Sequence, residues 1–129
     1  MLSGIRDELH ALAARFEYQR GSFDKALELL RRIPPSSPLR LRALWLEGAI
    51  HVRRATPLPA LAVFDEALRI APRGTDRELA IISLARVHYA MGQFNTASRT
   101  YDRLPPLSLY WPRAALEGAW AMSWSTSTA

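Results

Sequence analysis

The sequence predicts an all-α protein. The segments between its prolines are rich in Ala, Leu, Arg and Glu, which lose little rotamer freedom in a helix. These segments lack the sustained alternation of apolar and polar residues that a half-buried strand shows. Seven of the nine prolines fall in gaps between apolar-periodic segments, and Pro59 and Pro112 fall in the first turn of the segments that follow. A residue without a backbone donor marks a helix end or a first turn. The proline gaps, together with breaks at Gly21 and Gly92, delimit seven predicted helices, over about residues 4–20, 23–33, 39–54, 58–70, 76–91, 94–104 and 111–123.

The turns between these helices carry residues suited to helix ends. Gly21 and Gly92 follow predicted helices, where glycine adopts a left-handed conformation at little steric cost. Thr75 is a candidate N-cap. Thr56 is expected to cap a helix whose first residue is Pro57.

Short motifs recur at a spacing of about 34 residues. The segment Gly21–Ala26 resembles Gly92–Ala97, and Ala55–Ala60 occupies the corresponding place between them. Arg-Ile-Pro-Pro at residues 32–35 returns as Arg-Leu-Pro-Pro at residues 103–106. A series of small residues, spaced 34, 37 and 33 apart, comprises Ala14, Gly48, Ala85 and Gly118. The chain therefore contains an internal repeat, in which small residues are expected where paired helices approach closely.

This pattern resembles the tetratricopeptide repeat, a 34-residue helix–turn–helix unit. The middle repeat carries its pattern at Gly48, Ala60, Phe64, Ala67 and Pro72. The resemblance implies a right-handed α-α superhelix of about seven antiparallel helices, forming one domain over residues 1–129. Its repeats would span about residues 5–38, 39–72 and 76–108, followed by a half repeat over 111–123 and a tail over 124–129.

Two departures from the repeat pattern carry structural expectations. Ala55 stands where the turn usually has glycine, so a left-handed conformation there would cost about 1–2 kcal/mol. The longer step between the second and third repeats implies a three-residue insertion around residues 73–75.

No motif in the sequence points to catalysis. The chain has no cysteine, and its six glycines are isolated, so it has neither a thiolate site nor a phosphate loop. His51 and His88 lie at equivalent points of successive repeats. We interpret them as replacing the aromatic residue inside each helical hairpin, with a satisfied ring nitrogen; the alternative is a metal pair. The prediction is a protein that is not an enzyme and needs no metal or cofactor.

The resemblance also implies a binding surface, because in this family the first helices line a concave groove that receives peptides. The residues predicted to bind a partner there are Arg15, Tyr18, Arg42, Trp45, Arg53, Arg86 and Tyr89. Other residues expected in the groove are Glu8, Ala11, Gln19, Ala49, Val52, Leu79, Ile82 and Ala90. Arginine beside tryptophan or tyrosine is typical of interface hot spots and of carboxylate recognition. We expect a scaffold that binds a peptide segment or the C-terminal tail of another protein. The alternative is that Trp45, Tyr18 and Tyr89 pack between repeats and that the arginines form a solvated face.

The sequence suggests two further interaction surfaces. The predicted last helix lacks a covering partner helix in this sequence, so we expect a homodimer or docking surface at Trp111, Leu116, Trp120 and Trp124. The alternative is that the chain is a fragment of a longer repeat array. The formal net charge of +5 comes from 17 basic residues spread along the chain. That spread disfavours nucleic-acid binding, although a nucleic-acid-associated protein is the alternative function.

The sequence also predicts the cellular compartment of the protein. The N-terminus has acids at Asp7 and Glu8 and no apolar run, so it is not a signal peptide. No stretch approaches the roughly 18 apolar residues of a membrane span. We therefore expect a cytoplasmic protein, and the Arg-rich, Lys-poor composition suggests a bacterial one.

Overall fold

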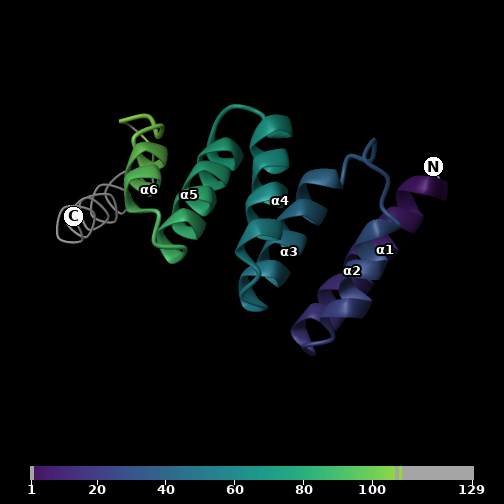
Figure 1. The fold of residues 1–129 in the computed structure, drawn as a ribbon. Coiled ribbons are helices and arrows are strands. Elements are labelled where there is room, and N and C mark those ends of the chain that lie inside the picture. The colour runs from purple at the N-terminus through teal and green to yellow at the C-terminus, as the bar shows by residue number, and fades with distance from the viewer. Residues whose placement is uncertain (1, 107, 109–129) are drawn as a thin grey trace. The chain divides into compact units, whose positions relative to one another are not determined.

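The computed structural model describes residues 2–106 and 108, and the regular structure of this part of the chain is entirely helical (Figure 1). Its helices are α1 (Leu2–Gln19), α2 (Phe23–Arg31), α3 (Arg40–Arg53), α4 (Pro57–Ile70), α5 (Thr75–Ala90) and α6 (Phe94–Tyr101). The all-α prediction is confirmed for these residues. The seventh predicted helix, over residues 111–123, lies outside them.

The chain divides into two compact units, Met1–Val63 and Phe64–Ala129. In the first unit α1 packs against α2, and in the second α5 packs against α6. Ala14 and Ala26 are fully buried in the first of these hairpins, as are Ala85 and Ala97 in the second. These small side chains lie inside the hairpins, as the sequence predicted.

Three helix ends share one pattern of backbone hydrogen bonds. After α1, the N–H of Ser22 bonds to the carbonyl of Glu17 at 2.8 Å and the N–H of Gly21 to that of Tyr18 at 3.0 Å. After α3, the N–H of Thr56 bonds to the carbonyl of His51 and the N–H of Ala55 to that of Val52. After α5, the N–H of Gln93 bonds to the carbonyl of His88 and the N–H of Gly92 to that of Tyr89. This is the Schellman motif, in which the residue before the last donor is left-handed. The sequence recurrence in these turns is therefore also a recurrence of backbone geometry.

The left-handed residue of the second turn is alanine. Ala55 has φ +56°, whereas Gly21 and Gly92 have φ +81° and +78° in the equivalent positions. Ala55 therefore adopts the left-handed conformation for which the sequence predicted an energetic cost, because the Schellman motif at the end of α3 requires a positive φ there.

Replacing Ala55 by glycine is expected to raise the free energy of unfolding by about 1 kcal/mol. The substitution removes the left-handed strain of about 1–2 kcal/mol, and the greater freedom of glycine in the unfolded chain offsets part of the gain. Urea unfolding would measure the change. Ala62→Gly, at an exposed position within α4, is the control and should lower stability by up to about 1 kcal/mol. A loss of stability in both variants would contradict this account of the turn.

The two Pro-Pro segments also fold alike. The N–H groups of Arg32 and Ile33 bond to carbonyls three residues back, as do those of Arg103 and Leu104, at distances of 3.1–3.2 Å. The N–H of Ser37 bonds to Pro34, and that of Ser108 to Pro105, both at 3.0 Å. Such bonds tighten the last turn of a helix. For this reason α2 and α6 end at residues 31 and 101, earlier than the predicted 33 and 104.

The helix starts agree only in part with the sequence prediction. Pro57 is the first residue of α4, as expected. The hydroxyl of Thr56, however, donates to the carbonyl of His51 at 3.1 Å, so it completes the end of α3. Thr75 is the first residue of α5, and Gly74, at φ +111°, precedes it as the capping residue. The prediction that Thr75 is a cap is wrong, because glycine occupies the residue before the helix.

Candidate functional site

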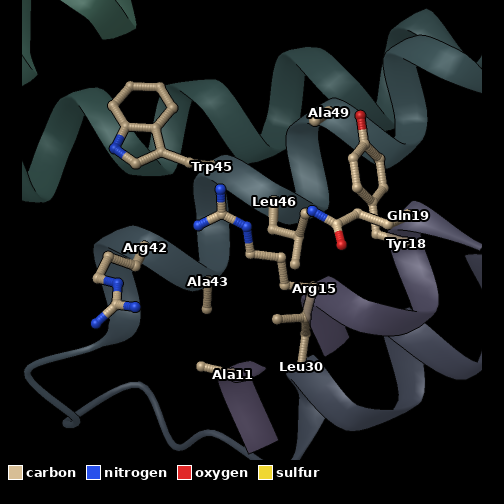
Figure 2. Close-up of a pocket in the computed structure, with 10 residues that line it drawn as sticks. All are labelled: Ala11, Arg15, Tyr18, Gln19, Leu30, Arg42, Ala43, Trp45, Leu46 and Ala49. Carbon is tan, nitrogen blue, oxygen red and sulfur yellow. The ribbon is translucent and has the colours of Figure 1, made fainter. Parts of the chain in front are cut away.

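A pocket of about 390 Å³ opens in the first unit (Figure 2). Residues of α1 and α3 line it together with Leu30 of α2, and the full set is Ala11, Arg15, Tyr18, Gln19, Leu30, Arg42, Ala43, Trp45, Leu46 and Ala49. The contributors from each long helix are mostly three, four or seven residues apart and so share one helix face. The structure thus brings four of the predicted binding residues together: Arg15, Tyr18, Arg42 and Trp45.

The walls of the pocket differ from its floor. Figure 2 shows Arg42 at one end and Tyr18 with Gln19 at the other, while Arg15 extends from α1 in the direction of the Trp45 indole. Leu30 and Ala43 are buried members of the first unit's hydrophobic core, and Leu46 packs against it. The pocket therefore combines an apolar floor with cationic and aromatic groups at its rim.

The charge at the pocket is positive. Arg42 lies 3.7 Å from Glu8, and both side chains are more than half exposed, so this pair is weak in water. Arg15 is exposed and forms no ion pair within residues 2–106. A guanidinium that faces solvent beside an apolar floor can accept a carboxylate in a bidentate pair.

Arg53 lies beyond the Tyr18 end of the pocket. Its guanidinium is 5.4 Å from the ring centroids of both Tyr18 and Phe23, whose rings are 5.8 Å apart. Arg54 also covers Phe23 and forms an ion pair with Asp24. These contacts hold Tyr18 at the hairpin turn, so Arg53 supports a wall of the pocket and is not among its lining residues.

The remaining predicted residues lie elsewhere. Arg86 and Tyr89 belong to α5 in the second unit, where Tyr89 packs edge-on against Phe94 with ring centroids 5.2 Å apart. Ile82, also expected in the groove, is fully buried because α5 is apolar across residues 80–82. Trp111, Leu116, Trp120 and Trp124 lie outside the described residues.

The histidines make local contacts that fit the interpretation of a satisfied ring. Nδ1 of His51 is 3.2 Å from the Thr56 hydroxyl, and Nδ1 of His88 is 2.6 Å from Oε1 of Gln93. Each partner follows its histidine by five residues, across the Schellman turn. No group of three or more His, Asp or Glu residues in the described part of the chain is arranged to hold a metal ion.

The floor of the pocket was not predicted from the sequence. Leu30 comes from the second helix of the hairpin, and Ala43 and Leu46 continue the α3 face that carries Arg42 and Trp45. Their apolar character identifies them as core candidates, but only the packing of the three helices shows that a cavity ends on them.

The regular structure of the described residues is thus all-helical, and the first unit carries a basic, aromatic-rimmed pocket. Comparison with protein-family models found no matching model, and comparison with curated proteins found no match. Among the residues described, no helix is long and apolar enough to cross a membrane.

Proposed function

We propose that the protein is a non-enzymatic scaffold whose first unit binds a peptide segment or the C-terminal tail of another protein. The observation that carries this proposal is the convergence of Arg15, Arg42, Trp45 and Tyr18 on one pocket with an apolar floor. The volume of about 390 Å³ falls within the range of roughly 300–1,000 Å³ typical of ligand sites.

Each part of the pocket has a role in the proposed recognition. Arg15 and Arg42 would bind a carboxylate, from an acidic side chain or a free C-terminus. An apolar side chain of the peptide would lie on the Leu46 floor beside the Trp45 indole, and the Tyr18 hydroxyl offers a polar contact at the far end. The bound segment would therefore carry an acidic or C-terminal group next to an apolar anchor.

The fold proposed with this function is a tetratricopeptide-like superhelix. It rests on the sequence motifs, and the recurrence of one turn geometry after α1, α3 and α5 supports a repeated architecture. The proposed part of Arg86 and Tyr89, both on α5, in partner binding rests on these motifs alone.

The proposal is tested by replacing, one at a time, two arginines that have similar surroundings. Arg42 and Arg32 are 58% and 57% exposed, and each lies within 4 Å of an exposed glutamate, but only Arg42 lines the pocket. Against a peptide selected from random sequences with free C-termini, Arg42→Gln should weaken binding about fivefold, or about 1 kcal/mol. Arg32→Gln should change the affinity less than twofold. Fluorescence polarisation would measure both.

Equal losses in the two variants would contradict a specific role for the pocket.

The salt dependence of binding separates this function from the nucleic-acid alternative. Peptide binding on an apolar floor should weaken modestly between about 50 and 200 mM salt. An oligonucleotide that binds instead, and loses orders of magnitude of affinity over that range, would replace the proposal.

A further inference from the structure

The outer face of α1 carries an exposed apolar stripe. Its members are Leu2, Ile5, Leu9, Leu12 and Phe16, which are 79%, 58%, 61%, 59% and 56% exposed. They follow one another at alternating intervals of three and four residues, which is the spacing of the a and d positions of a coiled coil. A continuous apolar surface of this kind is typical of an interface.

The stripe lies opposite the face that α1 uses in its own hairpin. Asp7 and Ala14 are buried, and Ala11 and Tyr18 pack against the core of the first unit. At 100° per residue these four centre on one side of the helix, and the stripe centres about 180° away. Helix α1 therefore has two apolar faces, of which the hairpin with α2 covers one.

We propose that this exposed stripe packs antiparallel against the same stripe of a second copy of the chain. Leu9 would then lie on Leu12 of the second copy, and Ile5 on Phe16 of the second copy, with each contact made twice about a two-fold axis. The stripe is self-complementary in this arrangement because large apolar side chains meet in each of these layers. The stripe itself contains none of the residues that line the pocket, although Arg15, which flanks the stripe, also lines the pocket. The interface is distinct from the C-terminal surface expected from the sequence.

The charges beside the stripe select the antiparallel orientation. Glu8 and Arg15 flank it on one side at g positions of the heptad, and Arg6, Ala13 and Arg20 flank it on the other at e positions. In an antiparallel pair, g faces g, so Glu8 of each copy faces Arg15 of the other. In a parallel pair, g faces e, so Arg15 would face Arg20 and Glu8 would face Ala13. The antiparallel pair thus gains two attractions, whereas the parallel pair brings like charges together.

Glu8 is accessible for this contact. Its side chain is 52% exposed, and its partner in the same chain, Arg42, lies 3.7 Å away and is 58% exposed. The carboxylate has acceptor capacity for a second guanidinium. Because the seam joins only one helix from each copy, we expect self-association at about micromolar concentrations and not an obligate dimer.

Sedimentation equilibrium from about 1 to 500 µM tests the interface with two matched variants. Leu9 and Leu58 are both exposed leucines, at 61% and 68%, but only Leu9 belongs to the stripe. Leu9→Glu should weaken self-association at least tenfold, whereas Leu58→Glu should leave it unchanged. Circular dichroism would confirm that both variants fold. A wild type that stays monomeric at 500 µM, or a dimer that survives Leu9→Glu, would overturn the proposal.

Charge reversal tests the orientation in the absence of any peptide. Glu8→Arg should weaken self-association severalfold, and the double variant Glu8→Arg/Arg15→Glu should restore it, because the exchanged charges again face each other. In a parallel pair, position 8 faces only Ala13, so Glu8→Arg alone would change self-association little. The double variant would strengthen association, because its new carboxylate at position 15 would face Arg20. An unchanged single variant, or a loss without recovery in the double, would overturn the antiparallel arrangement.

Discussion

Replacing Ile50 by alanine is expected to lower the free energy of unfolding by about 2–5 kcal/mol. Ile50 is fully buried and is one of the largest side chains to be so among the described residues. It belongs to the core cluster of the first unit, which includes Leu27, Leu30 and Ile33. Removing its outer carbons leaves a cavity among side chains from several helices, and these can relax only in part.

Urea unfolding of the variant beside the wild type would measure this loss. The control is Val52→Ala, two residues further along α3, where the side chain is 52% exposed. Truncation at that position should change stability by less than about 0.5 kcal/mol. Comparable losses at both positions would contradict the orientation of α3, which places Ile50 in the core and Val52 at the surface.

Replacing Trp45 by alanine is expected to weaken peptide binding about 30-fold, or about 2 kcal/mol. Trp45 is half-buried and lines the pocket beside Leu46, where its indole supplies much of the apolar contact area. Tryptophan in such a position is the residue most often found to dominate binding energy. The loss should appear mainly as faster dissociation of the peptide.

The matched variants separate an aromatic contact from a change in fold. Trp45→Phe should recover part of the affinity because it keeps an aromatic ring in the pocket. Leu58→Ala removes an exposed apolar side chain, 68% accessible, on a helix that does not line the pocket, and should bind as the wild type does. Fluorescence polarisation gives the affinities and stopped-flow the dissociation rates. A Trp45→Ala variant that binds normally would show that the pocket does not hold the peptide.

The helices were predictable because their signals are local. Proline placement and the Ala, Leu, Arg and Glu content located six of them to within three residues at each end. The largest differences include the ends of α2 and α6, where bonds to the third residue back replace the helical bond to the fourth. Whether a last turn tightens in this way depends on how residues such as Ile33 and Leu104, both buried, are packed. That packing is not encoded in a local pattern.

The rim of the pocket was predictable from helical spacing, but its floor was not. Arg15 and Tyr18, three residues apart, share one face of α1, as Arg42 and Trp45 share one face of α3. Leu30 reaches the same cavity from α2, and this depends on how three helices pack. The exposed stripe on α1 shows the same limit: periodicity predicts that a helix has an apolar face, but not which of two such faces the rest of the chain covers.

The pocket of the first unit is proposed to receive the carboxylate and the apolar anchor of a peptide. Nuclear magnetic resonance titration of the isotopically labelled protein with the selected peptide tests this binding mode most directly. We predict that the largest shifts occur at the Trp45 indole N–H, the Arg15 side chain and the backbone of Ala49. Amidation of the peptide C-terminus, or loss of its acidic side chain, should reduce them. Shifts that leave these groups unchanged while the peptide binds would contradict the account.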